Sequence, residues 1–231
     1  MFKKLLFSIL CALYTTTLLA STCIPNAVSF VHRGHTLNEI DQREAGAIKK
    51  YLKKLGLTKK VVEVRQLGRG YYSRGVYLLK YHDGEQEVLK HYLKKRKEQR
   101  EKDIAGHRHL QQFNLGLGWY TIQVKRVTKK TALFLEYRSG RSVFSLLKDH
   151  TLPTEFREQL IVDFNRFTSK LKEVMEDGHL AEYRIYPYEQ NPPLKEKLYA
   201  FRWYENSFSI YLHPDNVLLS PQGEFIIVDP Y

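Results

Sequence analysis

Apolar and polar residues alternate along the middle of the chain, a pattern typical of half-buried β-strands. The predicted strands are residues 61–68, 75–81, 86–92, 119–127 and 131–137. Residues 82–84, His-Asp-Gly, separate the second and third strands, and Asp-Gly favours the backbone angles of a tight hairpin. The pattern therefore predicts five strands, of which 75–81 and 86–92 form a hairpin.

A second pattern, with apolar residues three and four positions apart, predicts helices on both sides of these strands. The predicted helices are residues 36–55, capped by Thr36, then 94–114, 142–150 and 154–177. The last of these carries its apolar residues on one face: Phe156, Leu160, Ile161, Phe164, Phe167, Leu171 and Val174. The aromatic segment 183–208 stays unassigned, with a short helix at 194–203 as one interpretation. Two short strands are predicted around the turn at 221–223.

The N-terminus has the layout of a secretory signal peptide over residues 1–22. A basic start precedes the apolar run 5–20, and small residues follow it. This predicts a secreted or periplasmic protein, with an uncleaved membrane anchor or a buried core helix as the alternatives. Cys11 and Cys23 are the two cysteines of the chain, so removal of the signal would leave no pair for an intramolecular disulfide.

The chain has 37 Lys and Arg against 25 Asp and Glu, a formal net charge of +12. Such a charge favours anionic partners, including an anionic membrane surface, through the basic stretches 49–60 and 94–102. Solvated helix faces are the simpler interpretation of these stretches. The sequence contains no zinc-finger spacing, helix-turn-helix signature or RNP-like strand, so we expect no specific nucleic-acid binding.

Several residues between the predicted strands point to phosphate chemistry. Gly68 and Gly70 lie in a turn where small residues let backbone amides approach a phosphate, although a plain hairpin would use glycine in the same way. The segment resembles the glycine-rich loop of protein kinases, except that Val76 lies one position late. Lys90 resembles the strand lysine that neutralises nucleotide phosphates in that family. Glu101 is its expected partner on the following helix, with Asp103 and Glu98 as alternatives.

The segment after the fifth strand resembles a kinase hinge, where backbone groups hold the adenine and where Glu136 and Tyr137 would fall. The sequence Tyr-Leu-His-Pro-Asp-Asn at 211–216 is similar to the catalytic loop of aminoglycoside and choline kinases. The resemblance implies that Asn216 and Asp229 bind Mg²⁺ (or Mn²⁺) on the phosphates of ATP.

The chain departs from this family at the catalytic aspartate, whose position is occupied by Tyr211. A phenol with an ordinary pKa of about 10 is a poor base at neutral pH. Three interpretations stay open: Asp215 supplies the carboxylate, as in selenoprotein-O-type pseudokinases that transfer AMP; His213 acts instead; or the domain binds nucleotide without turnover.

The resemblance covers residues 61–231 and implies an α+β, two-lobed protein-kinase-like fold with an antiparallel five-stranded N-lobe sheet and a reduced helical C-lobe. The expected organisation is a signal peptide at 1–22, a helical extension at 23–60, the N-lobe at 61–137 and the C-lobe at 138–231. Short chains of this kind resemble secreted effector kinases of bacterial pathogens and lipopolysaccharide-core heptose kinases.

We therefore expect a secreted transferase that uses ATP and Mg²⁺ to modify a hydroxyl group on a protein, by phosphorylation or AMP transfer. The alternatives are a sugar or lipopolysaccharide kinase and a catalytically inactive nucleotide-binding scaffold. A signal peptide fits poorly with a bacterial periplasm, which offers little ATP, so export into a host or a eukaryotic lumen is the consistent destination.

Overall fold

Helices and mainly antiparallel sheets make up the computed structural model, which describes residues 30–32, 35–37, 42–57, 60–68, 73–113, 118–128, 131–184, 194–205 and 207–230. The signal-peptide prediction and Gly70 lie outside these residues. The described residues divide into two units, which we call the seven-stranded unit, 30–101 with 124–137, and the C-terminal unit, 102–123 with 138–230. The chain is thus an α+β protein with mainly antiparallel sheets.

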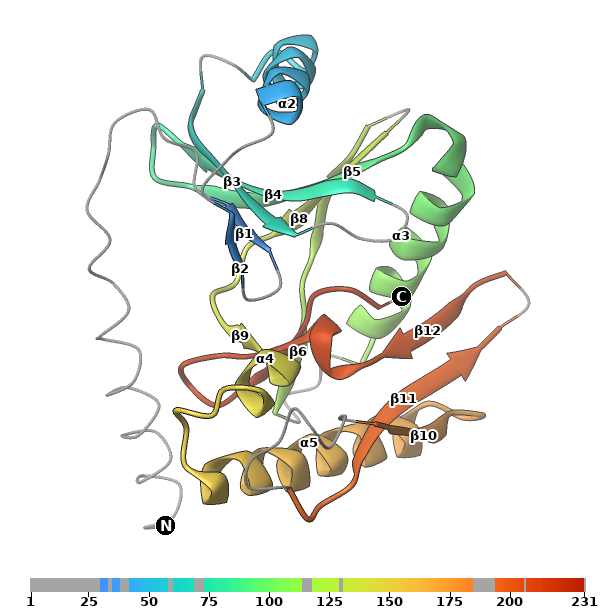
Figure 1. Cartoon of the computed structure of the whole chain (residues 1–231). Coiled ribbons are helices and arrows are strands. Elements are labelled where there is room, and N and C mark those ends of the chain that lie inside the picture. Colours follow the sequence, from blue (N-terminus) through green and yellow to red (C-terminus); the bar gives the residue numbers. More distant parts are fainter. Residues whose placement is uncertain are drawn as a thin grey trace. The chain divides into compact units, whose positions relative to one another are not determined.

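The seven-stranded unit is built on one sheet in the order β2-β1-β3-β4-β5-β8-β7 (Figure 1). Its strands are β1 (Phe30–His32), β2 (His35–Leu37), β3 (Val61–Gly68), β4 (Ser73–Tyr81), β5 (Gln86–Tyr92), β7 (Val124–Val127) and β8 (Ala132–Glu136). The last five in that order, from β3 to β7, are antiparallel and are the five strands expected for this part of the chain. The prediction of five strands missed β1 and β2, and β1 pairs with β3 in parallel.

Helix α2 (Gln42–Lys54) packs on this sheet through Ile48 and Leu52, whose side chains join the sheet's buried residues. The buried sheet residues of this core are Tyr77, Leu79, Leu89, Ala132 and Phe134. The predicted helix start at Thr36 is wrong, because Thr36 lies in β2 and pairs with Val31. The apolar periodicity located the body of the helix but not its start.

Helix α3 (Lys97–Gln111) follows a 3₁₀ turn, η1 (Lys94–Arg96), and runs from one unit into the other. In the C-terminal unit, α4 (Val143–Leu147) and α5 (Thr154–Val174) accompany two sheets. The first has the order β6-β14-β13-β9: β6 (Trp119–Thr121), β9 (Arg141–Ser142), β13 (Val217–Leu219) and β14 (Phe225–Ile227). The second has the order β10-β11-β12: β10 (His179–Tyr183), β11 (Leu198–Tyr204) and β12 (Ser209–Leu212).

Two expectations for this unit are wrong. Residues 119–127 are not one strand, because β6 pairs with β14 while β7 joins the seven-stranded sheet. The segment 194–203 is not a helix, because β11 pairs with strands on both sides. Its aromatic residues favour a strand, because aromatic side chains fit a pleated sheet, but they do not alternate cleanly enough to predict one.

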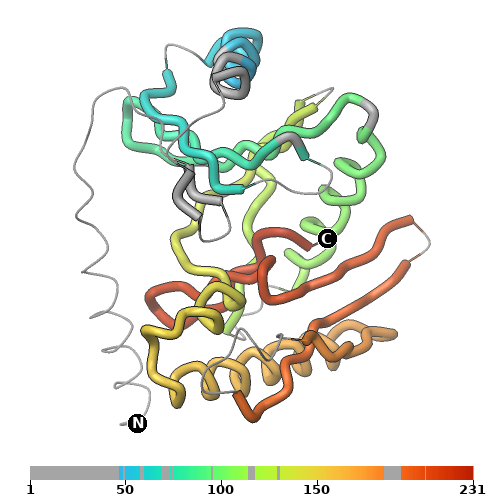
Figure 2. Tube along the Cα trace, viewed as in Figure 1, coloured from blue at the N-terminus to red at the C-terminus, as the bar shows by residue number. Residues whose placement is uncertain are grey.

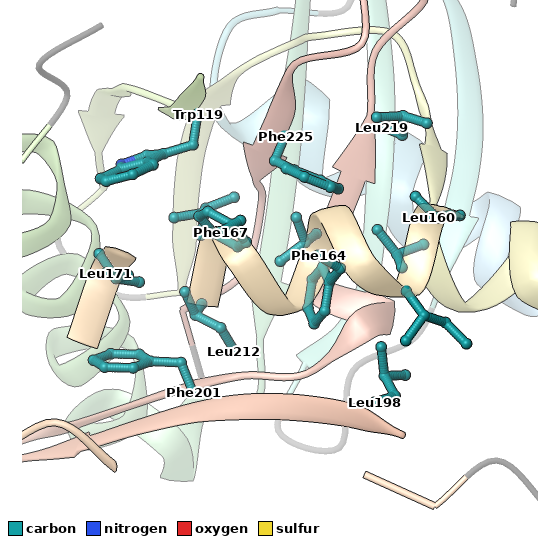
Figure 3. Close-up of a cluster of buried hydrophobic side chains, with 14 of the residues drawn as sticks. Trp119, Leu160, Phe164, Phe167, Leu171, Leu198, Phe201, Leu212, Leu219 and Phe225 are labelled. Carbon is teal, nitrogen blue, oxygen red and sulfur yellow. The ribbon is translucent and has the colours of Figure 1, made fainter. Parts of the chain in front are cut away.

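Helix α5 lies between the two sheets of the C-terminal unit and forms its core (Figure 3). Leu160, Phe164 and Leu171 are fully buried, and Phe167 is 4% exposed. The figure shows these side chains between Trp119, Leu219 and Phe225 on one side and Leu198, Phe201 and Leu212 on the other. The apolar face predicted from periodicity is therefore the buried face, except at its end, where Val174 is 36% exposed.

Helix α5 is also fixed to β11 by polar contacts. The side-chain amide of Asn165 donates to the Lys197 carbonyl at 2.6 Å and accepts from the Tyr199 amide at 2.9 Å. Glu158 accepts from the amides of Lys195 and Glu196. The start of the strand that carries Arg202 is therefore held to α5 by hydrogen bonds between helix side chains and the strand backbone, as well as by apolar packing.

No helix among the described residues is long and apolar enough to cross a membrane.

Candidate nucleotide and metal site

The predicted catalytic segment and the predicted metal-binding aspartate lie side by side in the C-terminal unit. We call residues 211–216 and 228–230 the C-terminal loop pair; they belong to the red end of the trace in Figure 2. The amide of Tyr211 donates to the Pro230 carbonyl at 2.8 Å, and the amide of Val228 donates to the Asn216 carbonyl at 3.0 Å. These two bonds join both ends of the loop pair, and Asp229 lies between them in sequence.

The adjoining hairpin sets this register. Val217 of β13 pairs with Ile227 of β14, and the chains continue past this pair into Asn216 and Val228. Buried apolar residues hold the hairpin, with Val217 and Ile227 fully buried. In this register Asn216 lies opposite Val228, and Asp229 is the next residue along the chain. The hairpin therefore brings together the backbone of two residues that are thirteen positions apart in sequence.

The turn that carries Asp215 and Asn216 is a 3₁₀ turn, η3 (Pro214–Asn216), capped by His213. The backbone amide of Asp215 donates to Nδ1 of His213 at 3.2 Å, and the Asn216 amide donates to the His213 carbonyl at 2.9 Å. Pro214 occupies the first position of the turn, where its missing N–H costs nothing. Asp215 and Asn216 are both half-buried.

The hydrogen bond to His213 bears on its chemistry. Because a backbone N–H can only donate, Nδ1 of His213 must be the unprotonated acceptor, which leaves the ring proton on Nε2. A neutral imidazole in this tautomer has no free lone pair for accepting a substrate proton. This arrangement suits a capping and positioning role for His213, whereas the carboxylate of Asp215 keeps its ability to accept a proton.

Tyr211, at the position where the resemblance expects an aspartate, lies in β12 opposite Arg202 of β11. The guanidinium carbon of Arg202 is 4.5 Å from the centre of the Tyr211 ring. Hydrogen bonding to the Tyr211 hydroxyl raises the pKa of Arg202 above its ordinary value. The ring of His213 is 5.3 Å from that of Tyr211 and 6.0 Å from that of Tyr183, onto which it stacks.

The seven-stranded unit contains the other described residues of the predicted site, which are Gly68, Lys90, Glu101, Glu136 and Tyr137, whereas the alternative acid Asp103 belongs to the C-terminal unit. Lys90 is 6% exposed in the middle of β5, between Val76 of β4 and Leu133 of β8, and its ammonium is 5.6 Å from the Tyr92 ring. Burial of a lysine is unusual because its charge loses hydration, so this position is more constrained than that of an ordinary strand lysine.

The predicted acidic partner of Lys90 and its two alternatives differ in how far they are buried. Glu101 is exposed and forms an ion pair with Lys97 at 3.5 Å, one turn earlier in α3. Glu98 is also exposed, whereas Asp103 is 1% exposed. Of the three acids, Asp103 is therefore the one that α3 buries.

Gly68 is the last residue of β3 and pairs with Val76. A side chain at Gly68 would meet no atom within 4 Å, which leaves open space beside this backbone. Glu136 ends β8 opposite Glu87, and Tyr137 follows it. Both hinge candidates are half-buried.

Metal binding would depend on the C-terminal loop pair together with nucleotide oxygens. The described residues contain no group of three or more His, Cys, Asp or Glu side chains arranged to hold a metal ion. One amide and one carboxylate fit a hard cation whose other ligands are phosphate oxygens and water, as is common for Mg²⁺.

Sequence reasoning missed Arg202 and Tyr183, because segment 183–208 was not assigned to strands. The signal that could have indicated β11 is the aromatic content of 198–204, and within a strand Arg202 falls on the face opposite to the buried Phe201. No protein-family model matches the chain, and no curated protein matches it.

Proposed function

We propose that the chain is a kinase-like transferase that binds ATP with Mg²⁺ (or Mn²⁺) and modifies a hydroxyl group on a protein. The observation that carries this proposal is the C-terminal loop pair, in which two backbone hydrogen bonds hold Asn216 beside the segment of Asp229. Two hard oxygen donors on a rigid hairpin are the protein's contribution to a magnesium-nucleotide site.

The architecture supports a kinase-like, two-lobed interpretation of the two units. Five antiparallel strands with a buried lysine on the third, followed by a helix, correspond to the expected N-lobe. In this proposal Lys90 neutralises the nucleotide phosphates, Glu101 is its acidic partner, and Gly68 begins the phosphate-covering turn. Glu136 and Tyr137 supply the hinge that holds the adenine.

Asp215 is the proposed proton acceptor, because the Nδ1 of His213 is occupied by the Asp215 amide. In phosphorylation, the substrate hydroxyl oxygen bonds to the γ-phosphorus, the bond to the bridging oxygen breaks, and ADP leaves. In AMP transfer, the oxygen attacks the α-phosphorus and pyrophosphate leaves. In either case the hydroxyl proton passes to the carboxylate of Asp215. General-base assistance contributes about 10² to 10⁴-fold, so positioning and charge carry the rest.

The test is label transfer from ATP. The purified chain is incubated with Mg²⁺ or Mn²⁺, a eukaryotic cell extract as the source of protein substrates, and either γ-labelled or α-labelled ATP. Label from γ alone means phosphorylation, and label from α means AMP transfer. ATP binding without transfer of either label would support the alternative of an inactive scaffold, to which Tyr211 in the catalytic position lends some weight.

Matched variants separate chemistry from folding. Asp229→Ala should abolish label transfer and weaken magnesium-dependent ATP binding. Asp163→Ala removes a carboxylate from the solvent side of α5, where it pairs with Arg166, and should leave both unchanged. Equal activity of Asp229→Ala and the unmodified chain would refute the metal assignment. Transfer of label to sugars, with none to proteins, would favour the sugar-kinase alternative.

A further inference from the structure

One face of the three-stranded sheet carries a polar and aromatic row that the proposed catalysis does not use. Backbone pairing sets His179 of β10 opposite Arg202, and Arg202 opposite Tyr211. Tyr204, two residues after Arg202 on the same strand, lies on the same face, and its ring is 5.8 Å from that of His179. We call these four residues the Arg202 face. The neighbouring residues Phe201 and Leu212 point to the opposite face and are fully buried.

Arg202 is the charged centre of this face. Its guanidinium lies over the Tyr211 ring at 4.5 Å, and the hydroxyls of Tyr211 and Tyr204 both interact with it. Among the residues that the structure describes, no carboxylate forms an ion pair with Arg202, and its buried Nε atom has no hydrogen-bond partner there. A guanidinium held by two phenols therefore keeps hydrogen-bonding capacity for an anionic group.

The Arg202 face leads to the C-terminal loop pair. The Arg202 guanidinium is 4.5 Å from the Tyr211 ring, and that ring is 5.3 Å from the ring of His213, the residue that caps the turn of Asp215. Two such steps bring the guanidinium within about 10 Å of His213, which an extended peptide spans in about three residues. An anion on Arg202 would therefore lie two or three peptide residues from His213, whose side chain caps the turn that carries Asp215.

We propose that Arg202 determines substrate specificity by binding an acidic side chain two or three residues from the acceptor hydroxyl of a peptide. The inference rests on the proposed function for the identity of the acceptor. The formal net charge of +12 complements an acidic substrate, and the planar guanidinium matches a carboxylate or a phosphate with two parallel hydrogen bonds. The flat ring of Tyr211 lies under the guanidinium and positions it for this contact.

The experiment measures peptide binding without nucleotide, by fluorescence anisotropy with the purified full chain. The probes are fluorescein-labelled nonapeptides with a central serine, flanked at two and three positions on either side by Asp, by phosphoserine, by Asn or by Lys. The Asp and phosphoserine peptides should bind about tenfold to a hundredfold more tightly than the Asn peptide, the range expected for charge-assisted hydrogen bonds. The two acidic probes show which anion Arg202 prefers.

Variants at Arg202 test whether this residue recognises the charge of the peptide side chain. Arg202→Gln should remove the preference for Asp over Asn, and Arg202→Glu should reverse it in favour of the Lys peptide. Arg202→Lys should retain part of the preference. Arg166→Gln removes the same charge from an exposed position of α5 and should change nothing. Circular dichroism and thermal melting identify any variant that fails to fold, and Arg202→Lys then carries the test.

Three results would overturn the proposal. One is equal binding of the Asp and Asn peptides by the unmodified chain, and another is an equal loss of both in Arg202→Gln, which would mean a structural role. The third is Arg202-dependent binding of glucose 6-phosphate with no peptide binding, which would assign the face to a sugar phosphate. Failure of the proposed function is seen separately, as absence of magnesium-dependent ATP binding while the peptide preference persists.

Discussion

Replacement of Phe225 by alanine should destabilise the C-terminal unit by about 3 to 5 kcal/mol, the usual cost of removing a buried phenyl ring from a core. Phe225 is 7% exposed. Its ring stacks on Phe167 at 5.2 Å and meets Phe164 edge-on at 5.8 Å. Figure 3 shows it between the hairpin that leads to Asp229 and helix α5.

The milder change Phe225→Leu separates the ring contacts from the volume. Leucine keeps most of the buried volume but loses both aromatic pairs, each worth about 0.5 to 1.5 kcal/mol beyond burial. We therefore expect Phe225→Leu to cost about 1 to 3 kcal/mol. A domain of ordinary stability, about 5 to 15 kcal/mol, survives that loss and can still be assayed for ATP binding.

Urea unfolding followed by circular dichroism measures both changes, with the slope of the transition compared between variants to check that the same surface unfolds. Val174→Ala is the control, because Val174 is 36% exposed at the end of the same helix and should shift the free energy of unfolding by no more than about 0.5 kcal/mol. A loss below about 1 kcal/mol for Phe225→Ala would refute the assigned packing of β14 on α5.

Three further predictions concern the C-terminal unit. Burial lowers the pKa of His109 below 6.5, and the charge of Glu205 opposes this shift. As pH falls, the imidazole is therefore protonated in the unfolded chain before it is protonated in the folded chain. The stability that His109 contributes is present above pH 6.5 and is lost as pH falls through the folded pKa. His109→Phe should reduce the difference in unfolding free energy between about pH 7.5 and pH 5, and an unchanged difference would contradict this. Gly178→Ala should cost about 1 to 3 kcal/mol in urea unfolding, because the new Cβ would lie 2.5 Å from the buried Phe201 ring; a neutral effect would contradict that close approach. Asn165→Ala should cost about 1 to 3 kcal/mol and speed amide exchange in the segment entering β11, where its side chain makes hydrogen bonds of 2.6 and 2.9 Å; unchanged exchange would show that the helix does not hold this strand.

Local sequence patterns were sufficient to predict those helices and strands in which the spacing of the apolar residues matches the buried face. The strands 61–68 and 86–92 were predicted with the bounds that the structure gives, and the turn between β4 and β5 contains Gly84 at a φ of +86°. Helix α5 starts at the predicted Thr154, and its apolar stripe is buried. In each case the local pattern and the tertiary environment agree.

Long-range pairing explains what could not be predicted. Trp119 and Val124 belong to adjacent segments of similar composition, yet their strands join different sheets. The strand of Trp119 pairs with β14, which lies about a hundred residues later in the sequence, and no local pattern predicts that pairing. The strand β11 was missed because its partners, not its own period, define it. In the candidate site, the short predicted hairpin was enough to expect Asn216 near Asp229. The position of Arg202 opposite Tyr211 could not be predicted, because it depends on the pairing of β12 with β11.

The central place of β14 in its sheet has a consequence for folding during synthesis. β14 lies between β13 and β6 and pairs in parallel with residues that left the ribosome about a hundred positions earlier. Contacts of such large sequence separation form late, because closing a long loop costs entropy before any contact repays it. A nascent chain that has emerged only as far as Leu219 lacks both the strand and Asp229. The sheet of β14 and the C-terminal loop pair would thus be completed in one late step, after most of the polypeptide had already condensed.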